Sequence, residues 1–396
     1  MKHRIVVLGA GYAGANAAGR LARRLHPDDT EITLVNADPD FVERVRMHQL
    51  ATGQELRRRA LSDVFAGTHV TVRPARVTAV DVDRKTVELV DQHGADEIDY
   101  DTLVYALGST TADHGVPGVA EHAYHLAGKQ AALRLRQRLR DLAAGTRVLV
   151  VGGGLTGIEA ATEIAETRPD LDVAIAAQRG VGDWLSDKAQ RHLRRVFTRL
   201  GITVHEHSDI ARVDKTGAVT SAAARIPAQL TVWTAGFTTH PIAAATTLEV
   251  ADTGQIVVDA TMRSVSHSDV YAVGDAGIAK GAGGKPLRMS CASGVPMAWQ
   301  AADAIAARLT GRKISEHTIR YYAQCISLGR RDGIIQLVTP DDQVKSTVVT
   351  GGSAARIKEF ICAGAAWSIA HPTALLPSRR RHITAATEAK TVPVTS

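Results

Sequence analysis

Two glycine-rich turns are the residues of this chain with the clearest chemistry. Each follows a short apolar run and opens an alanine-rich helical pattern, at residues 9–14 and 152–157. In such a turn the first glycine permits the tight strand exit, the second lets backbone approach a pyrophosphate, and the third lets helix pack on strand. The pyrophosphate then meets free N–H groups at a helix N-terminus. Two such turns predict two dinucleotides, and a chain that holds both a nicotinamide and a flavin can pass a hydride between them.

The elements around the two turns form two βαβ units. The first turn lies between a strand at residues 4–8 and a helix at 13–25, and the second lies between a strand at 147–151 and a helix at 157–167. Short apolar runs are typical of buried parallel strands, which helices connect. Because the pattern of the first unit returns at residues 269–275, we expect the second unit to be inserted in the first.

These elements predict an α/β fold with two Rossmann-like dinucleotide-binding domains and a small C-terminal α+β region. A chain of 396 residues is long enough for two or three domains. We expect the first domain at residues 1–112 and 248–312, and the inserted domain at 113–247. The remaining residues, 313–396, are expected to form the C-terminal domain, ending in a mobile tail.

Composition and charge narrow the classes of function. The net charge is +6, but the arginines are scattered through helical patterns, so we do not expect nucleic acid as a partner. Cys291, Cys325 and Cys362 are far apart in the chain and indicate neither a disulfide framework nor a zinc site, so no metal is expected. The start of the chain lacks an apolar leader and no apolar run could span a bilayer, which predicts a cytoplasmic protein.

Four motifs in order carry a resemblance to a known family. They lie at residues 9–14, 100–109, 152–159 and 270–275. Together they resemble the pyridine nucleotide-disulfide oxidoreductase superfamily of two-dinucleotide flavoproteins, and within it the type II NADH dehydrogenase and apoptosis-inducing-factor-like branch. The resemblance implies that the first domain holds FAD and that the inserted domain holds NADH or NADPH.

The resemblance assigns most candidate residues to FAD. The carboxylate of Asp275 is expected to hydrogen-bond the ribityl chain, and Asn36 takes the place of the acid that holds the adenosine ribose. An amide both donates and accepts, so Asn36 still fits a hydroxyl. The helix N-terminus around Val295 is expected to stabilise negative charge on the reduced flavin. The other candidates are Gly9, Gly11, Tyr12, Ala13, Gly14, Arg44, His48, Gln49, Ala106, Gly108 and Gly274. Gly236, at which the apolar run of residues 230–236 ends, is a further cofactor-binding candidate. For Arg44, His48 and Gln49 a charged helix face is the alternative.

The second turn is assigned to the nicotinamide dinucleotide. Its cradle consists of Gly152, Gly154 and Gly157. By resemblance Glu159 faces the meeting point of nicotinamide and flavin and is a catalytic candidate, whereas a first-turn glutamate favoured by the helix dipole is the alternative. The strand at residues 172–177 ends without the carboxylate that would bind the ribose diol of NAD. Arg179 follows it as a candidate for a 2′-phosphate, so both NADH and NADPH stay open.

The electron acceptor is specified less closely. No cysteine pair lies in residues 41–53, where disulfide reductases of this superfamily place theirs, so disulfide reduction is not expected. The quinone-side motif of type II dehydrogenases keeps Ala298 and Gln300 but has Pro296 in place of its first glutamine, which leaves Gln300 as a catalytic candidate. We therefore expect oxidation of NAD(P)H with a quinone or another small molecule as acceptor. The alternatives are a soluble biosynthetic flavoenzyme with one organic substrate and a redox-sensing or interaction flavoprotein with slow turnover.

The C-terminal region contains an amphipathic helical pattern at residues 354–370. Its apolar face consists of Ile357, Phe360, Ile361, Gly364 and Trp367, with Lys358 and Glu359 outside it. Such a face fits peripheral membrane contact, docking on the protein itself, or docking on a second subunit of a homodimer. The expected location is therefore cytoplasmic, with membrane-peripheral attachment left open.

Overall fold

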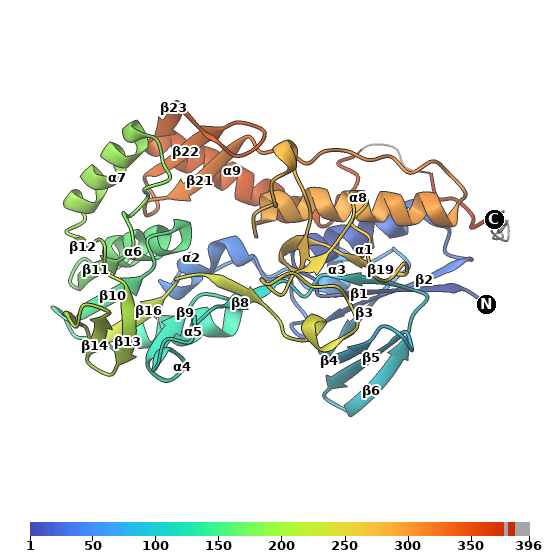
Figure 1. Cartoon of the computed structure of the whole chain (residues 1–396), viewed down its shortest axis with the longest axis horizontal. Helices are drawn as coiled ribbons and strands as arrows, with labels where there is room; N and C mark the ends of the chain where they lie inside the picture. Colours follow the sequence, from blue (N-terminus) through green and yellow to red (C-terminus); the bar gives the residue numbers. More distant parts are fainter. Residues whose placement is uncertain (376–378, 385–396) are drawn as a thin grey trace, which may run out of the picture.

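Two parallel sheets organise the structure into two α/β halves (Figure 1). In each sheet one strand leads directly into a glycine turn. The computed structural model describes residues 1–375 and 379–384. The first sheet has the order β19-β7-β1-β2-β3. Its strands are β1 (His3–Leu8), β2 (Thr30–Asn36), β3 (Val70–Pro74), β7 (Thr102–Tyr105) and β19 (Val270–Ala272). Every pairing in it is parallel, and all four residues of β7 are buried, which explains why such strands show continuous apolar runs.

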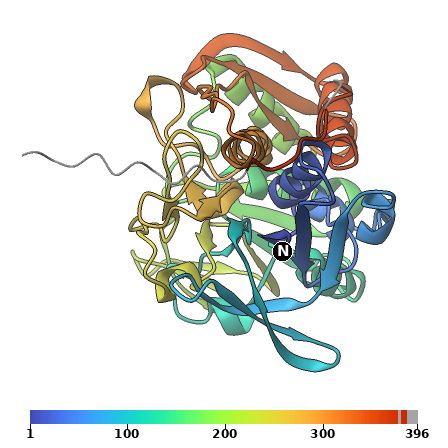
Figure 2. The same cartoon turned by 90° about the vertical axis from the view of Figure 1, so that its right-hand side faces the viewer.

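Two alanine-rich helices cover one face of the first sheet. Helices α1 (Tyr12–Arg24) and α8 (Cys291–Leu309) pack side by side, and Figure 2 shows them together above the sheet. Small side chains allow their backbones to approach closely. An antiparallel sheet projects from the other side of this half; it consists of β4 (Arg76–Asp81), β5 (Thr86–Asp91) and β6 (Gly94–Asp99).

The second parallel sheet is formed by the part of the chain between β7 and β19, and it also has five strands. Its order is β12-β11-β10-β16-β9, with β9 (Ala123–His125), β10 (Arg147–Val151), β11 (Asp172–Ala176), β12 (Thr203–His205) and β16 (Leu230–Trp233). The helices of this half are α5 (Lys129–Arg140), α6 (Leu155–Thr167) and α7 (Asp187–Arg199). The architecture confirms the predicted α/β fold with two Rossmann-like domains, whereas the exact domain limits stay a prediction.

A two-stranded ribbon carries both crossings of the chain between the two halves. The chain leaves the first half along β8 (Ser109–Thr111) and returns along β17 (Phe237–Thr239). The two strands pair antiparallel, with Thr111 opposite Phe237 and Ser109 opposite Thr239. The inserted half is therefore attached to the first half at one place.

The C-terminal region joins the two halves from the other side. Strands β21 (Ala323–Ser327), β22 (Gly333–Val338) and β23 (Val344–Thr350) form an antiparallel sheet, and α9 (Gly352–Ser368) covers one of its faces. Apolar residues of the sheet and of the turn after β21, Ile326, Leu328 and Ile334 among them, share a core with the inserted half. The buried side of α9 consists of Ala354, Lys358, Cys362 and Ala366.

The remaining elements are short. They are η1 (Arg44–Arg46), α2 (Met47–Ala51), α3 (Leu61–Val64), α4 (Val119–His122), β13 (Ile210–Asp214), β14 (Gly217–Thr220), β15 (Arg225–Pro227), η2 (Ala243–Ala245), β18 (Ile256–Val257), η3 (Gly274–Ala276), β20 (Gly277–Ile278) and η4 (Ala282–Gly284). Helix α2 follows η1 and packs against α5 and α6 where the two halves meet.

Two expectations about the chain need correction. Helix α8 begins at Cys291, after an extended Ser290, so Val295 lies in its second turn and not at its N-terminus. Proline is typical of the first turn of a helix, so the sequence alone favours a helix that begins near Pro296. In the structure Pro296 lies inside α8. The expected tail falls largely on residues 376–378 and 385–396, which lie outside the described residues. Its described part, 379–384, is held against the first half: the Arg381 N–H donates to the Arg24 carbonyl at 2.9 Å.

Candidate functional site

The first glycine turn has an open position directly at the N-terminus of α1. Gly9 has φ +92°, and a Cβ on Gly14 would lie 1.8 Å from the Gly9 carbonyl oxygen, so a side chain fits at neither position. A Cβ on Gly11 would meet no atom within 4 Å. Gly9 therefore provides the tight turn and Gly14 the close helix packing. The open space at Gly11 lies where a pyrophosphate would approach the helix N-terminus.

The second glycine turn repeats this geometry at the N-terminus of α6. Gly152 has φ +125°, a Cβ on Gly157 would lie 1.8 Å from the Gly152 carbonyl oxygen, and a Cβ on Gly154 would meet nothing within 4 Å. The chain thus contains two cradles of the same construction, one in each half. Each fits the pyrophosphate of a dinucleotide.

A carboxylate and a buried guanidinium lie near the first cradle. Asp275 Oδ2 accepts a hydrogen bond from Ser109 Oγ at 2.6 Å, and Arg44 Nη2 donates to the same hydroxyl at 3.1 Å. Burial lowers the pKa of Arg44, and the nearby Asp275 opposes that effect. Gly274 and Gly294 come so close that a Cβ on Gly294 would lie 3.2 Å from the Gly274 Cα, which brings the first turn of α8 to Asp275. These groups fit the ribityl and flavin portions of FAD.

The other predicted FAD residues differ in whether their polar atoms already have partners within the protein. Asn36 Oδ1 accepts from the Ala10 N–H at 2.9 Å and its Nδ2 donates to the Asp38 carbonyl at 2.7 Å, so its amide shapes the turn. Tyr12 is the first residue of α1, directly after Gly11 of the first cradle. Its hydroxyl is buried and has no hydrogen-bond partner among the described residues. An unpaired buried hydroxyl at this place fits a cofactor atom. Ala106 packs against Gly9, and Gly108 faces Arg44.

An exposed arginine lies at the edge of the second cradle, just after the end of β11. Arg179 is 83% exposed, and its guanidinium lies 3.4 Å from the Asp183 carboxylate. Ala177 stands where a carboxylate would bind a ribose diol. The nearby Glu206 accepts from the Val181 N–H at 2.8 Å and from Arg194, so its carboxylate is already engaged.

Glu159 lies in a buried cluster drawn from three parts of the chain. Its Oε1 accepts from the Ser327 N–H at 3.0 Å and from Lys358 Nζ, and its Oε2 lies 3.6 Å from His48 Nδ1. Burial lowers the pKa of Lys358 to about 8. Burial also lowers the pKa of His48 well below its ordinary value, because the charged imidazolium loses its hydration. The sequence places Glu159 on the first turns of α6 but gives no sign that its carboxylate reaches the C-terminal region.

A second buried carboxyl follows one turn later on α6. Glu163 is fully buried and accepts a hydrogen bond from Gln54 Nε2. Burial raises the pKa of Glu163 to about 7, so this group is half protonated near neutral pH.

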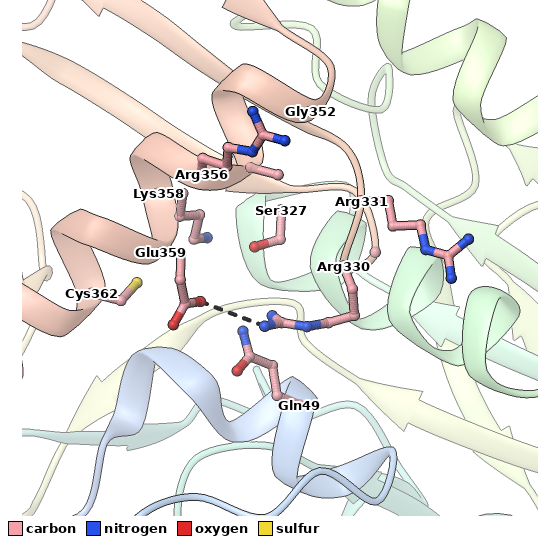
Figure 3. Close-up of a pocket in the computed structure, with 11 residues that line it drawn as sticks. Gln49, Ser327, Arg330, Arg331, Gly352, Arg356, Lys358, Glu359 and Cys362 are labelled. Carbon is pink, nitrogen blue, oxygen red and sulfur yellow. Dashed lines mark ion pairs between the residues drawn. The ribbon is translucent and has the colours of Figure 1, made fainter.

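A cavity of about 340 Å³ opens beside this cluster (Figure 3). It is bounded by α2, by the turn between β21 and β22, and by the first half of α9. Its lining residues are Gln49, Ser327, Gly329, Arg330, Arg331, Gly352, Ala355, Arg356, Lys358, Glu359 and Cys362. Of these, only Gln49 is among the site residues predicted from the sequence. For Lys358 and Cys362 the signal is their spacing with Ala354 and Ala366, which places small residues and one lysine on a single face of α9.

Three of the predicted residues that do not line this cavity are held by contacts elsewhere in the structure. Gln300 is buried and its Nε2 donates to the Ala260 carbonyl, so the structure does not bring it to the lining. Val295 packs against the core of the first half. Gly236 has φ +140° and its carbonyl accepts from the Ala112 N–H at 3.1 Å, next to the ribbon.

The three cysteines lie in buried surroundings. Burial raises the pKa of Cys291 and of Cys325 to about 11, and it also raises the pKa of Cys362. Thiols of this kind are protonated at neutral pH and react slowly as nucleophiles. Their environment favours packing over redox exchange.

A comparison with protein-family models confirms the superfamily that the sequence motifs resemble. The model described as pyridine nucleotide-disulphide oxidoreductase matches residues 3–306. The chain belongs to this family. The matched residues contain both cradles, Glu159 and Asp275, whereas the C-terminal sheet and α9, which complete the cavity, follow them.

Several known proteins are similar to this chain over most of their length. The demethylphylloquinone reductase NdbB of Synechocystis is 26% identical, covering 84% of this chain and 86% of its own. A type II NADH:quinone oxidoreductase of Staphylococcus haemolyticus is 25% identical, covering 93% and 96%. Among solved structures, NDH2 from Plasmodium falciparum in complex with NADH has a TM-score of 0.78 at 14% identity, covering 96% and 99%, and shows the shared fold.

Proposed function

We propose that this protein is an FAD-dependent NAD(P)H dehydrogenase that passes electrons to a quinone. The observation that carries the proposal is the pair of matched cradles, each with an open middle glycine, Gly11 in one half and Gly154 in the other. The activities of similar proteins, demethylphylloquinone reductase and type II NADH:quinone oxidoreductase, support a quinone as the acceptor.

Different residues of the first half would bind different parts of FAD. The cradle at Gly11 would receive the pyrophosphate, Asp275 and Ser109 would hydrogen-bond the ribityl chain, and the N-terminus of α8, which lies against Gly274, would favour negative charge on the reduced flavin. When bound, FAD supplies the chemistry of accepting a hydride from NAD(P)H and passing on two electrons. The protein contributes position and a favourable electrostatic environment for the reduced form.

The buried cluster supplies protons beside the cavity. Lys358 lines the cavity, is held by Glu159, and has its pKa lowered to about 8 by burial. Such an ammonium is charged at neutral pH yet releases its proton more readily than an exposed lysine. Reduction of a quinone to a quinol takes up two protons, so Lys358 is placed to donate one of them and Glu159 to hold its position.

Anaerobic stopped-flow spectroscopy tests this proposal. The yellow holoenzyme is mixed with NADH or NADPH, flavin bleaching is followed, and menadione is then added. We expect rapid bleaching and rapid return of the flavin absorbance. If neither nicotinamide bleaches the flavin, or if menadione does not restore its colour, the proposal is wrong.

We further propose that NADPH is accepted at the second cradle, because Arg179 is exposed where a 2′-phosphate would lie and Ala177 offers no repelling carboxylate. Arg179→Ala is expected to raise the KM for NADPH about tenfold, since a charge-assisted hydrogen bond contributes on the order of 1.5 kcal/mol, and to leave the KM for NADH within twofold. Arg212→Ala, at an exposed arginine on β13, is the control. If the ratio of the KM values for NADPH and NADH is unchanged in Arg179→Ala, Arg179 does not bind the 2′-phosphate.

The exposed face of α9 supports peripheral contact with a membrane. Within the part of the chain that the structure describes, no helix is long and apolar enough to cross a bilayer. The apolar face of α9 points to solvent, with Phe360 79% exposed and Ile357, Ile361 and Trp367 each about 40% exposed. This exposure supports a membrane, rather than the rest of the protein, as the partner of this face.

Liposome flotation tests the membrane contact with the full-length protein. We expect wild type to float with vesicles that contain anionic lipid, and Phe360→Glu/Ile361→Glu to stay in the dense fraction. Truncation of α9 would be a poor test, because Lys358 is buried against Glu159. Equal recovery of wild type and variant would refute the membrane contact, and a concentration-dependent dimer that the variant abolishes would assign the face to a second subunit.

A further inference from the structure

The cavity beside Lys358 has an excess of positive charge. Four of its lining residues are cationic, Arg330, Arg331, Arg356 and Lys358, whereas Glu359 is its one carboxylate. Glu359 is already engaged, because it pairs with Arg46 at 2.6 Å and with Arg330 at 3.5 Å. Within residues 1–375 and 379–384, neither Arg331 nor Arg356 forms an ion pair. Two exposed arginines of the lining therefore have no ion-pair partner among these residues.

The lining has few apolar groups for a hydrocarbon tail. Its non-polar contribution comes from Ala355, Cys362 and glycines, and no leucine, isoleucine, valine or aromatic side chain is among the lining residues. The floor instead carries hydrogen-bonding groups: Gln49, Ser327 and Lys358 are each less than a tenth exposed. Figure 3 shows the amide of Gln49 and the guanidinium of Arg330 on one side of the space and α9 on the other. A neutral quinone with a long isoprenoid chain finds little surface here.

The size of the cavity suits a small aromatic ligand. Its volume of about 340 Å³ lies at the lower end of the range of small-molecule sites, which is roughly 300–1,000 Å³. The exposed Arg331 and Arg356 of the lining are the groups that would bind an acid group on such a ligand, since planar guanidinium groups bind carboxylates and sulfonates through hydrogen bonds. The ring would then lie toward Gln49 and Cys362.

We propose that the acceptor reduced at this cavity is an anionic, bicyclic quinone that bears a carboxylate or sulfonate group. This inference rests on the proposed function and narrows its substrate class. The reaction balances without a further reagent: NAD(P)H supplies a hydride and the medium supplies one proton, the quinone becomes the quinol, and NAD(P)⁺ is released. The acid group takes no part in the redox change and serves only to bind.

Steady-state kinetics with two acceptors test the proposal on the holoenzyme. The acceptors are 1,4-naphthoquinone-2-sulfonate, which is anionic, and menadione, which is neutral. In Arg331→Gln/Arg356→Gln we expect kcat/KM for the sulfonate to fall at least tenfold more than kcat/KM for menadione. Raising the ionic strength from 20 to 200 mM should lower kcat/KM of wild type for the sulfonate selectively, because salt screens exposed charges.

A matched control removes the same charge elsewhere. Arg23 and Arg312 are exposed at the far end of the first half, so Arg23→Gln/Arg312→Gln lowers the net charge equally and should change neither kcat/KM more than twofold. Equal losses for both acceptors in the cavity variant, or a loss for the sulfonate in the control variant, would overturn the proposal.

A binding measurement separates this inference from the proposed function. Naphthalene-2-carboxylate is redox-inert, and calorimetry on the oxidised holoenzyme should show that it binds at least tenfold more tightly than 2-naphthalenemethanol. The double variant at Arg331 and Arg356 should abolish that difference. Absence of all quinone reduction would contradict the proposed function, whereas equal binding of the two naphthalenes to wild type would contradict the anionic acceptor.

Discussion

Replacing Glu163 with glutamine should stabilise the protein in a pH-dependent manner. Burial raises the pKa of this carboxyl from 4.5 to about 7, so the folded protein resists ionisation that the unfolded chain accepts. The contribution to stability is therefore fully present below pH 4.5 and is lost as the pH rises through 7. At 1.36 kcal/mol per pH unit the complete loss is about 3 kcal/mol, and the part between pH 5 and pH 8 is about 2.5 kcal/mol.

Urea unfolding at pH 5 and pH 8 measures this effect. Glu163→Gln carries no titratable group, so its free energy of unfolding relative to wild type should increase by about 2.5 kcal/mol between the two pH values. Glu55→Gln is the control, because Glu55 is exposed next to Gln54, and its difference from wild type should change by less than about 0.5 kcal/mol.

An infrared measurement checks the cause of the change directly. At pH 6 wild type should show the carbonyl stretch of a protonated carboxyl group, and Glu163→Gln should lack that band. A stability difference that is the same at pH 5 and pH 8 would refute the reasoning, as would an ionised Glu163 at pH 6.

The remaining predictions concern the cradles and the buried cluster. Gly11→Ala should fold but be purified with less than a tenth of the wild-type FAD, because its methyl group enters the open space of the first cradle; absorbance at 450 nm measures this. Gly154→Ala should keep FAD and raise the KM for NAD(P)H about tenfold. Gly157→Ala should yield no folded protein by circular dichroism, since its Cβ would lie 1.8 Å from a carbonyl oxygen. Lys358→Met leaves Glu159 buried without its ammonium, and should cost about 3 kcal/mol in urea unfolding while slowing flavin reoxidation by menadione more than flavin reduction. Unaltered FAD content in Gly11→Ala, or equal slowing of both half-reactions in Lys358→Met, would contradict these assignments.

The features that the sequence predicts well are those determined by neighbouring residues. The turn at Gly9 needs a positive φ and the absence of a Cβ at Gly14, and both requirements are visible in a few letters of sequence. The buried runs of β1 and β10 likewise follow from their own composition. The two-domain fold follows from two such units in order, which is why it could be predicted.

The cavity could not be predicted, because it depends on contacts between distant segments. Glu159, His48 and Lys358 belong to α6, α2 and α9, and their pairing requires the C-terminal sheet to pack on the inserted half. The orientation of α9 shows the same limit. Its larger apolar side chains suggest the buried face, yet the helix buries Lys358 among small residues, because Glu159 compensates that charge and small side chains allow close packing.

The ribbon of β8 and β17 has a consequence for how such a protein can change over evolutionary time. Because Thr111 and Phe237 lie opposite each other, the ends of the inserted half are adjacent, and a short turn between the two strands would close the first half without it. The inserted half could therefore be gained or exchanged at a single seam. The C-terminal sheet, however, buries Ile326, Leu328 and Ile334 against that half, so a host that lost the insert would expose this apolar surface. Two segments that are far apart in the gene must consequently be inherited as one unit.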